Sequence, residues 1–64
     1  MSENELIDAV HRLAAADKGY YALLRGAGAD TARWRSLVER ALGESRLPAA
    51  RSVVERVVRF FCGE

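Results

Sequence analysis

The chain has 64 residues, of which 50% are apolar and 30% are charged, and its formal net charge is +1. This length and composition predict one small globular domain over residues 1–64 and exclude an intrinsically disordered chain. One cysteine and one histidine exclude an internal disulfide and argue against a zinc site held by the protein alone. A core this small must be stabilised by helix packing, by self-association as a homodimer or by a partner.

The first predicted helix spans about residues 3–15. Ser2 followed three residues later by Glu5 has the spacing of a capping box. Asp8 and Arg12 form an i,i+4 pair on the polar side of this helix. Apolar residues recur at spacings of three and four and therefore share one face: Leu6, Val10, Leu13 and Ala14.

The second predicted helix is short, begins after Asp17 as its N-cap and stops at Gly26, where a glycine can adopt the left-handed conformation. Adjacent residues on a helix diverge by about 100°. Tyr20 and Tyr21 therefore cannot both be central to the core. Tyr20 precedes Leu24 by four residues, so we expect Tyr20 to point inward and Tyr21 to point outward towards a partner. The apolar residues of this helix are Tyr20, Tyr21, Leu23 and Leu24.

The third predicted helix spans about residues 31–42, with Asp30 or Thr31 as its N-cap and Gly43 at its end. Its apolar residues show the clearest helical period in the chain: Trp34, Leu37, Val38, Ala41 and Leu42. The two arginines that bracket Trp34 are expected to flank this apolar stripe.

The fourth predicted helix spans about residues 48–62, with Pro48 in its first turn and Gly63 at its close. Glu55 lies four residues before Arg59 and is expected to be exposed with it. Apolar pairs at helical spacing predict a helix rather than a strand: Val53, Val54, Val57, Val58 and Phe61 face inward. The fold expected from all four segments is an all-α, compact bundle of four short helices in a single domain.

Residues that could support catalysis are few. Cys62 and His11 are the only cysteine and the only histidine, so they are the only candidates for a Cys–His pair of nucleophile and base. We interpret His11 as a boundary residue and Cys62 as a small apolar filler. Glu3 and Glu5 need no catalytic role, because acidic side chains in the first turn of a helix interact favourably with the positive end of the helix dipole. The stretch GAGAD lacks the Lys-Ser/Thr continuation of a phosphate loop. We therefore expect no enzyme activity, no cofactor and no metal.

The acidic start MSENELIDAV lacks the basic beginning and the apolar core of a signal peptide. No apolar run reaches the length of a membrane span, and a lone cysteine is typical of a reducing compartment. The sequence therefore predicts a cytoplasmic protein that does not interact with a membrane.

Nine of the ten basic residues are arginines. Tyr, Trp and Arg are the residue types richest in interface hot spots, and an arginine surface with aromatics is also a footprint for nucleic acid. Two interpretations stay open: a surface that binds a partner, or a solvated face threaded by Glu39, Glu44 and Glu55. The predicted partner-binding residues are Tyr21, Arg25, Arg33, Trp34, Arg35, Arg56 and Arg59.

The stretch HRLAAADKGYYALLRGAGAD, residues 11–30, resembles the small, all-helical subunit of type I CRISPR surveillance complexes (Cascade). The residues that carry this resemblance are Leu13, Asp17, Lys18, Gly19, Ala22, Leu24, Arg25 and Asp30. RSLVERAL and VVERVVRFFCG are similar to apolar helices that follow in the family. Subunits of this family join a protein filament and present basic residues to nucleic acid. Of these nucleic-acid-contacting residues only Arg25 can be carried over to this chain, because only that local motif matches.

The chain is shorter than such subunits, and it also resembles the small phage-encoded anti-CRISPR proteins, which are short, single-domain and non-enzymatic. This resemblance implies an inhibitor that docks on a subunit of a CRISPR effector complex and sterically blocks target DNA or another subunit. The alternative is a small helical subunit that contacts nucleic acid through its arginines.

Overall fold

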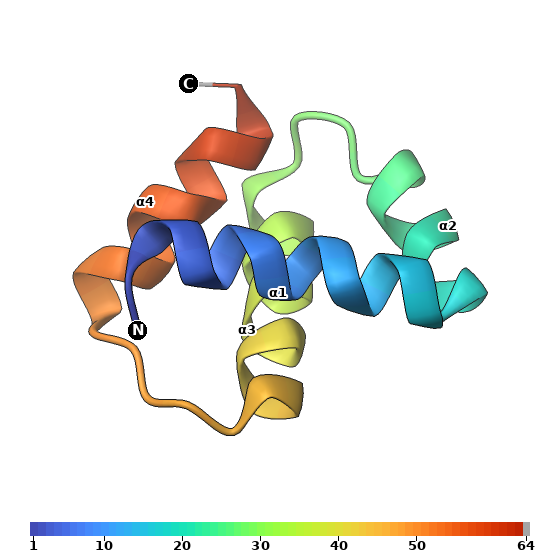
Figure 1. Cartoon of the computed structure of the whole chain (residues 1–64). Coiled ribbons are helices and arrows are strands. Elements are labelled where there is room, and N and C mark those ends of the chain that lie inside the picture. The colour runs from blue at the N-terminus through green and yellow to red at the C-terminus, as the bar shows by residue number, and fades with distance from the viewer. Residues whose placement is uncertain (64) are drawn as a thin grey trace.

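The structure is a computed structural model that describes residues 1–63. It contains four helices, α1 (Glu3–Ala16), α2 (Lys18–Gly26), α3 (Thr31–Ser45) and α4 (Arg51–Cys62), and no strand within the described residues. Helix α1 packs against all three other helices, crossing α3, with α4 beside its first half and α2 beside its last turns (Figure 1). The predicted all-α fold of four short helices is confirmed.

The beginnings of the first three helices are fixed by local hydrogen bonds, as the sequence predicts. Ser2 Oγ accepts from the Glu5 amide at 3.2 Å, and the Ser2 amide donates to Glu5 Oε1 at 2.9 Å, which completes the capping box. Asp17 accepts from the Tyr20 amide at 3.1 Å. Asp30, rather than Thr31, caps α3 by accepting from the amide three residues later.

Helix α2 ends at Gly26, as predicted, but the left-handed residue that follows it is Gly28, with φ +58°. The predicted end of the third helix is wrong. Helix α3 continues past Gly43 to Ser45 and stops at Arg46, which has φ +59°. A glycine permits the left-handed conformation but does not require it, and Gly43 remains helical because the residues after it continue the helix.

The predicted start of the fourth helix is also wrong, because Pro48 lies in the connection before α4. The backbone of Ala50 is extended, and α4 begins at Arg51 without a side-chain cap. Residues 47–50 must carry the chain from the end of α3 to the start of α4. An extended residue spans about twice the distance of a helical one, so this connection stays extended. The Pro48 carbonyl accepts a hydrogen bond of 2.9 Å from the α-ammonium group of Met1.

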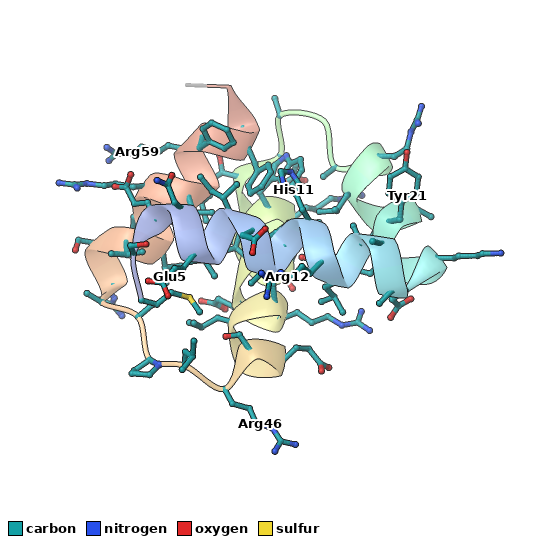
Figure 2. All side chains as sticks on the ribbon, in the orientation of Figure 1. Glu5, His11, Arg12, Tyr21, Arg46 and Arg59 are labelled. Atoms are coloured by element: carbon teal, nitrogen blue, oxygen red, sulfur yellow. The ribbon has the colours of Figure 1, made fainter. Side chains whose placement is uncertain are left out.

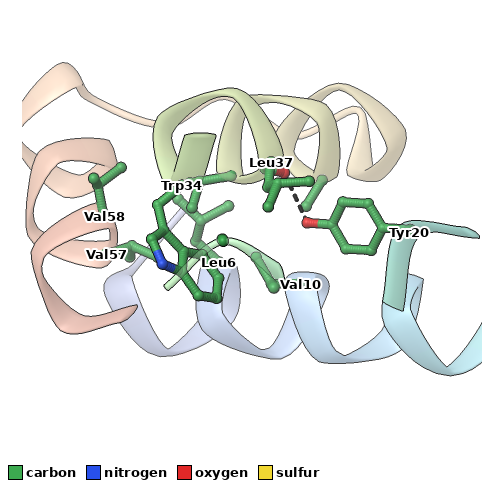
Figure 3. Close-up of a cluster of buried hydrophobic side chains, with 10 residues drawn as sticks. Leu6, Val10, Tyr20, Trp34, Leu37, Val57 and Val58 are labelled. Carbon is green, nitrogen blue, oxygen red and sulfur yellow. Dashed lines mark hydrogen bonds between the residues drawn. The ribbon is translucent and has the colours of Figure 1, made fainter. Parts of the chain in front are cut away.

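The core lies where α1, α3 and α4 meet, and it continues along α3 to α2 (Figure 3). Tyr20 is fully buried and its hydroxyl donates to the Leu37 carbonyl at 2.7 Å, which confirms the inward prediction. Trp34 Nε1 donates to the Gly28 carbonyl at 2.8 Å, and the indole stacks on Phe61 with ring centres 4.9 Å apart. The buried residues are Leu6, Val10, Tyr20, Ala27, Trp34, Leu37, Val38, Ala41, Val57 and Val58.

None of the four described helices combines the length and the apolar character that crossing a membrane requires.

Candidate partner-binding surface

Helix α2 carries the exposed aromatic side chain that the sequence assigns to a partner. Tyr21 keeps 48% of its surface exposed, and it projects from α2 at the edge of the molecule (Figure 2). Arg25, one turn later, donates from Nη1 to the Tyr21 hydroxyl at 3.1 Å, and its guanidinium carbon lies 5.8 Å from the ring centre. This hydrogen bond raises the pKa of Arg25 above its ordinary value. Tyr21 and Arg25 therefore present a hydrogen-bonded pair at the surface of α2.

A shallow groove of about 290 Å³ separates α2 from α3. The buried Leu37 lies at its base, and Leu23 stands at its rim with 54% of its surface exposed. We call this feature the α2–α3 groove, and its lining residues are Ala22, Leu23, Gly26, Arg33, Ser36 and Leu37.

The sequence prediction missed Leu23 as a surface residue. Tyr20 and Leu24 fill the inner side of α2, which leaves Tyr21 and Leu23 on its two opposite flanks. The available signal was an excess of large apolar residues over what one face of a nine-residue helix can bury. That signal does not say which flank faces α3.

Basic side chains surround α2. Arg33 Nε lies 3.4 Å from Asp30, and Arg40 lies 3.5 Å from Asp17 and 5.6 Å from the centre of the Tyr20 ring. Lys18 and Arg25 form no salt bridge with a carboxylate of residues 1–63. We define the α2 surface as Lys18, Tyr21, Ala22, Leu23, Arg25 and Arg33.

The structure brings Tyr21, Arg25 and Arg33 to the α2 surface and places the other four predicted residues elsewhere. Trp34 is only 8% exposed and belongs to the core. Arg35 lies on the opposite flank of the α3 stripe from Arg33, as predicted, and binds Glu55 of α4 at 2.6 Å. Arg56 binds Glu3 of α1 at 3.1 Å. Arg59 projects from α4, on the side of the molecule away from Tyr21 (Figure 2).

The single histidine and the single cysteine each have a different neighbour. The exposed His11 ring meets Phe61 edge-on at 5.8 Å. Cys62 Sγ lies 3.8 Å from Thr31 Oγ1. Over residues 1–63, no three His, Cys, Asp or Glu side chains gather in a way that would hold a metal ion.

No protein-family model matches this chain, and no curated protein or solved structure matches it significantly. The functional conclusion therefore depends on the α2 surface and on the residues that form it.

Proposed function

We propose that this protein is a non-enzymatic binding module that inhibits a larger assembly by docking on one of its protein subunits through the α2 surface. The observation that carries this proposal is the exposure of Tyr21 and Leu23 on a helix that is anchored from behind by the buried Tyr20. Tyr21 with Arg25 on one flank is a pair of the residue types that dominate interface hot spots, and Leu23 on the other flank adds exposed apolar area. Because α2 is already ordered, docking requires little further loss of conformational freedom.

The proposed partner is a subunit of a type I CRISPR surveillance complex, which makes the protein anti-CRISPR-like. The residues that carry the resemblance to the small subunit of that complex are concentrated in α2 and its N-cap, from Asp17 to Arg25. A surface that imitates a subunit would occupy the place of that subunit and so block target DNA or a neighbouring subunit.

The distribution of arginines supports a protein partner over direct contact with nucleic acid. Salt bridges with carboxylates of the same chain engage five of the nine arginines: Arg12, Arg33, Arg35, Arg40 and Arg56. The four arginines without such a partner within residues 1–63 belong to α2, to the end of α3 and to the two ends of α4: Arg25, Arg46, Arg51 and Arg59. Arg46 and Arg59 lie at opposite ends of the molecule (Figure 2). The cations available to phosphates are therefore dispersed rather than gathered in one stripe.

The proposed function is tested with purified type I surveillance complexes and their target DNA. We expect the protein to co-elute with a complex in size-exclusion chromatography and to prevent the complex from binding target DNA. The double variant Tyr21→Ala/Leu23→Ser should weaken this binding by about 2 kcal/mol or more, which is roughly thirtyfold in Kd. Leu47→Ser is the matched control, because Leu47 is 51% exposed but lies between α3 and α4.

Failure of the protein to bind any of these complexes would refute the proposed partner. A separate titration of the protein with DNA alone tests the alternative function. We expect no binding at physiological salt. Binding whose affinity falls linearly in log salt would instead indicate a subunit that neutralises phosphates.

A further inference from the structure

We propose that Lys18, Tyr21 and Arg25 together bind a pair of carboxylates on an acidic segment of the partner protein. We call these three residues the α2 outer face. This inference rests on the proposed function, because it specifies the chemistry that the partner presents to α2. It is carried by the positions of the two cations and by the hydrogen-bond donors that Tyr21 and Arg25 bring together.

The three residues of the α2 outer face lie on one side of the helix. Spacings of three and four residues place them within an arc of about 60° around the helix axis, and all three are exposed. Lys18 and Arg25 are separated by two turns, which is about 10 Å along the axis, and Tyr21 projects between them (Figure 2). Leu23 lies on the other flank, so this face is distinct from the α2–α3 groove.

Tyr21 and Arg25 bring unused hydrogen-bond donors to one point of this face. Arg25 donates from Nη1 to the Tyr21 hydroxyl at 3.1 Å. A guanidinium carries five N–H groups and a phenol carries its own O–H, so this bond leaves donors on both side chains. The two oxygens of a carboxylate can accept from both at once, in hydrogen bonds that the charge strengthens.

The two cations of this face have no carboxylate of their own. Lys18 and Arg25 form no salt bridge within residues 1–63. Asp17, the carboxylate next to Lys18 in the sequence, caps α2 and lies 3.5 Å from Arg40. The face therefore presents two positive charges and no negative charge, which is complementary to two carboxylates on a partner.

The number and spread of cations favour an acidic protein over nucleic acid. Nucleic-acid binding gains its affinity by neutralising many phosphates along a continuous basic track. The α2 outer face holds only two cations. The other arginines without a carboxylate partner within residues 1–63 lie at the end of α3 and on α4: Arg46, Arg51 and Arg59.

Two other surface features identify no occupant. A hollow of about 440 Å³ between α1 and the end of α3 is lined by charges of both signs, including Glu5, Arg12 and Glu44. Phe60 is 60% exposed on α4, yet it lines none of the described hollows.

The test uses two synthetic helical peptides that differ only in charge. One carries two glutamates separated by two turns on one side, and the other carries glutamines at the same positions. Each is titrated to millimolar concentration into the full-length, isotope-labelled protein, and chemical shifts are followed by NMR. We expect the glutamate peptide to shift the amides of Lys18, Tyr21 and Arg25 and the side-chain N–H signal of Arg25. The glutamine peptide should leave them unchanged.

Three variants test which groups hold the carboxylates. Lys18→Glu/Arg25→Glu should weaken binding of the glutamate peptide by about tenfold or more. Arg51→Glu/Arg59→Glu is the matched control, because it changes the net charge equally at two exposed arginines of α4 that also lack a carboxylate partner within residues 1–63. Tyr21→Phe keeps the ring but removes the hydroxyl donor, and it should weaken binding by about threefold.

Several outcomes would overturn the inference: no shift with the glutamate peptide, equal binding of the glutamine peptide, equal loss of binding in the α4 control, undiminished binding by either α2 variant, or duplex DNA shifting the same signals at physiological salt. If the peptide fails while Tyr21→Ala/Leu23→Ser still loses the surveillance complex, the proposed function stands and this inference falls. If the peptide binds but no complex does, the assignment of the α2 outer face stands and the proposed partner falls.

Discussion

Two adjacent tyrosines meet different environments, and this difference has a consequence for stability at alkaline pH. Burial raises the pKa of Tyr20 to about 12, and the charge of Arg40 offsets only part of that effect. In the unfolded chain a tyrosine ionises near pH 10. Between these two values the unfolded state loses this proton and the native state keeps it. Stability from this residue is therefore intact below pH 10 and is lost as the pH rises towards 12.

We therefore predict that the free energy of unfolding falls through this alkaline window, and urea unfolding at a series of pH values measures it. Tyr20→Phe removes the ionising group, so its stability should fall less steeply over the same window. Parallel decline of both proteins would show that other groups cause the loss. Ultraviolet absorbance of tyrosinate provides an independent readout, in which the ionisation of Tyr20 should appear only towards pH 12.

The hydroxyl of Tyr20 also contributes at neutral pH. Tyr20→Phe retains the ring but removes the 2.7 Å hydrogen bond to the Leu37 carbonyl. We predict a loss of about 1 kcal/mol, which lowers Tm by roughly 4–8 °C in a domain of this size. Calorimetry checks this value. Tyr21→Phe is the control and should leave Tm nearly unchanged, because the Tyr21 hydroxyl bonds only an exposed arginine.

At the scale of the element, the glycines of the described chain differ in what they demand of the backbone. Gly43 lies inside α3 with open space around it, whereas Gly28 has φ +58°. We predict that Gly43→Ala stabilises the fold by about 0.5–1 kcal/mol and that Gly28→Ala destabilises it by about 1–2 kcal/mol. Urea unfolding of the two variants measures both values. A loss of stability in Gly43→Ala would mean that α3 ends where the sequence pattern placed its end.

Helix beginnings could be predicted here and helix ends could not, for a physical reason. Ser2, Asp17 and Asp30 each cap a helix through a side-chain oxygen and an amide three residues away, which is a local interaction written in the sequence. The end of α3 at Arg46 and the extended connection around Pro48 depend on where α4 must pack. That position is set by contacts between residues far apart in the chain.

The salt bridge between α3 and α4 also could not be predicted from the sequence, because it joins two helices. The sequence spacing suggested Glu55 beside Arg59 on one helix, but Glu55 binds Arg35 across the helix interface. Both side chains are about two-fifths exposed, so we predict a coupling energy of about 0.2–1 kcal/mol. A double-mutant cycle of Arg35→Gln and Glu55→Gln measures it. The coupling should shrink in high salt, and a salt-independent value would contradict a screened surface pair.

At the scale of the whole molecule, a chain of this length has a total stability of about 3–10 kcal/mol. Leu6 is fully buried where α1 meets the core. We predict that Leu6→Ala costs about 2–5 kcal/mol and leaves a substantial unfolded population. Circular dichroism and amide NMR dispersion measure that population. Leu47→Ala, at a half-exposed position, is the control and should retain a fully folded spectrum.

The candidate site could be predicted only in part, because a surface is formed by helices that cross. Tyr21 and Arg25 share one helix, so their proximity follows from spacing alone. The apposition of Ala22 and Gly26 with Ser36 depends on how α2 packs against α3, which no single helix pattern specifies. Trp34 has the residue type of a hot spot, but its stacking on Phe61 assigns it to the interior.

The placement of Trp34 gives the molecule its own optical reporter. It is the only tryptophan in the chain, and its indole is enclosed, hydrogen-bonded and stacked in the folded state. Its fluorescence emission should therefore lie at short wavelength in the native protein and move to longer wavelength when water reaches the ring. Every unfolding curve described above can then be recorded from the natural chain without a dye.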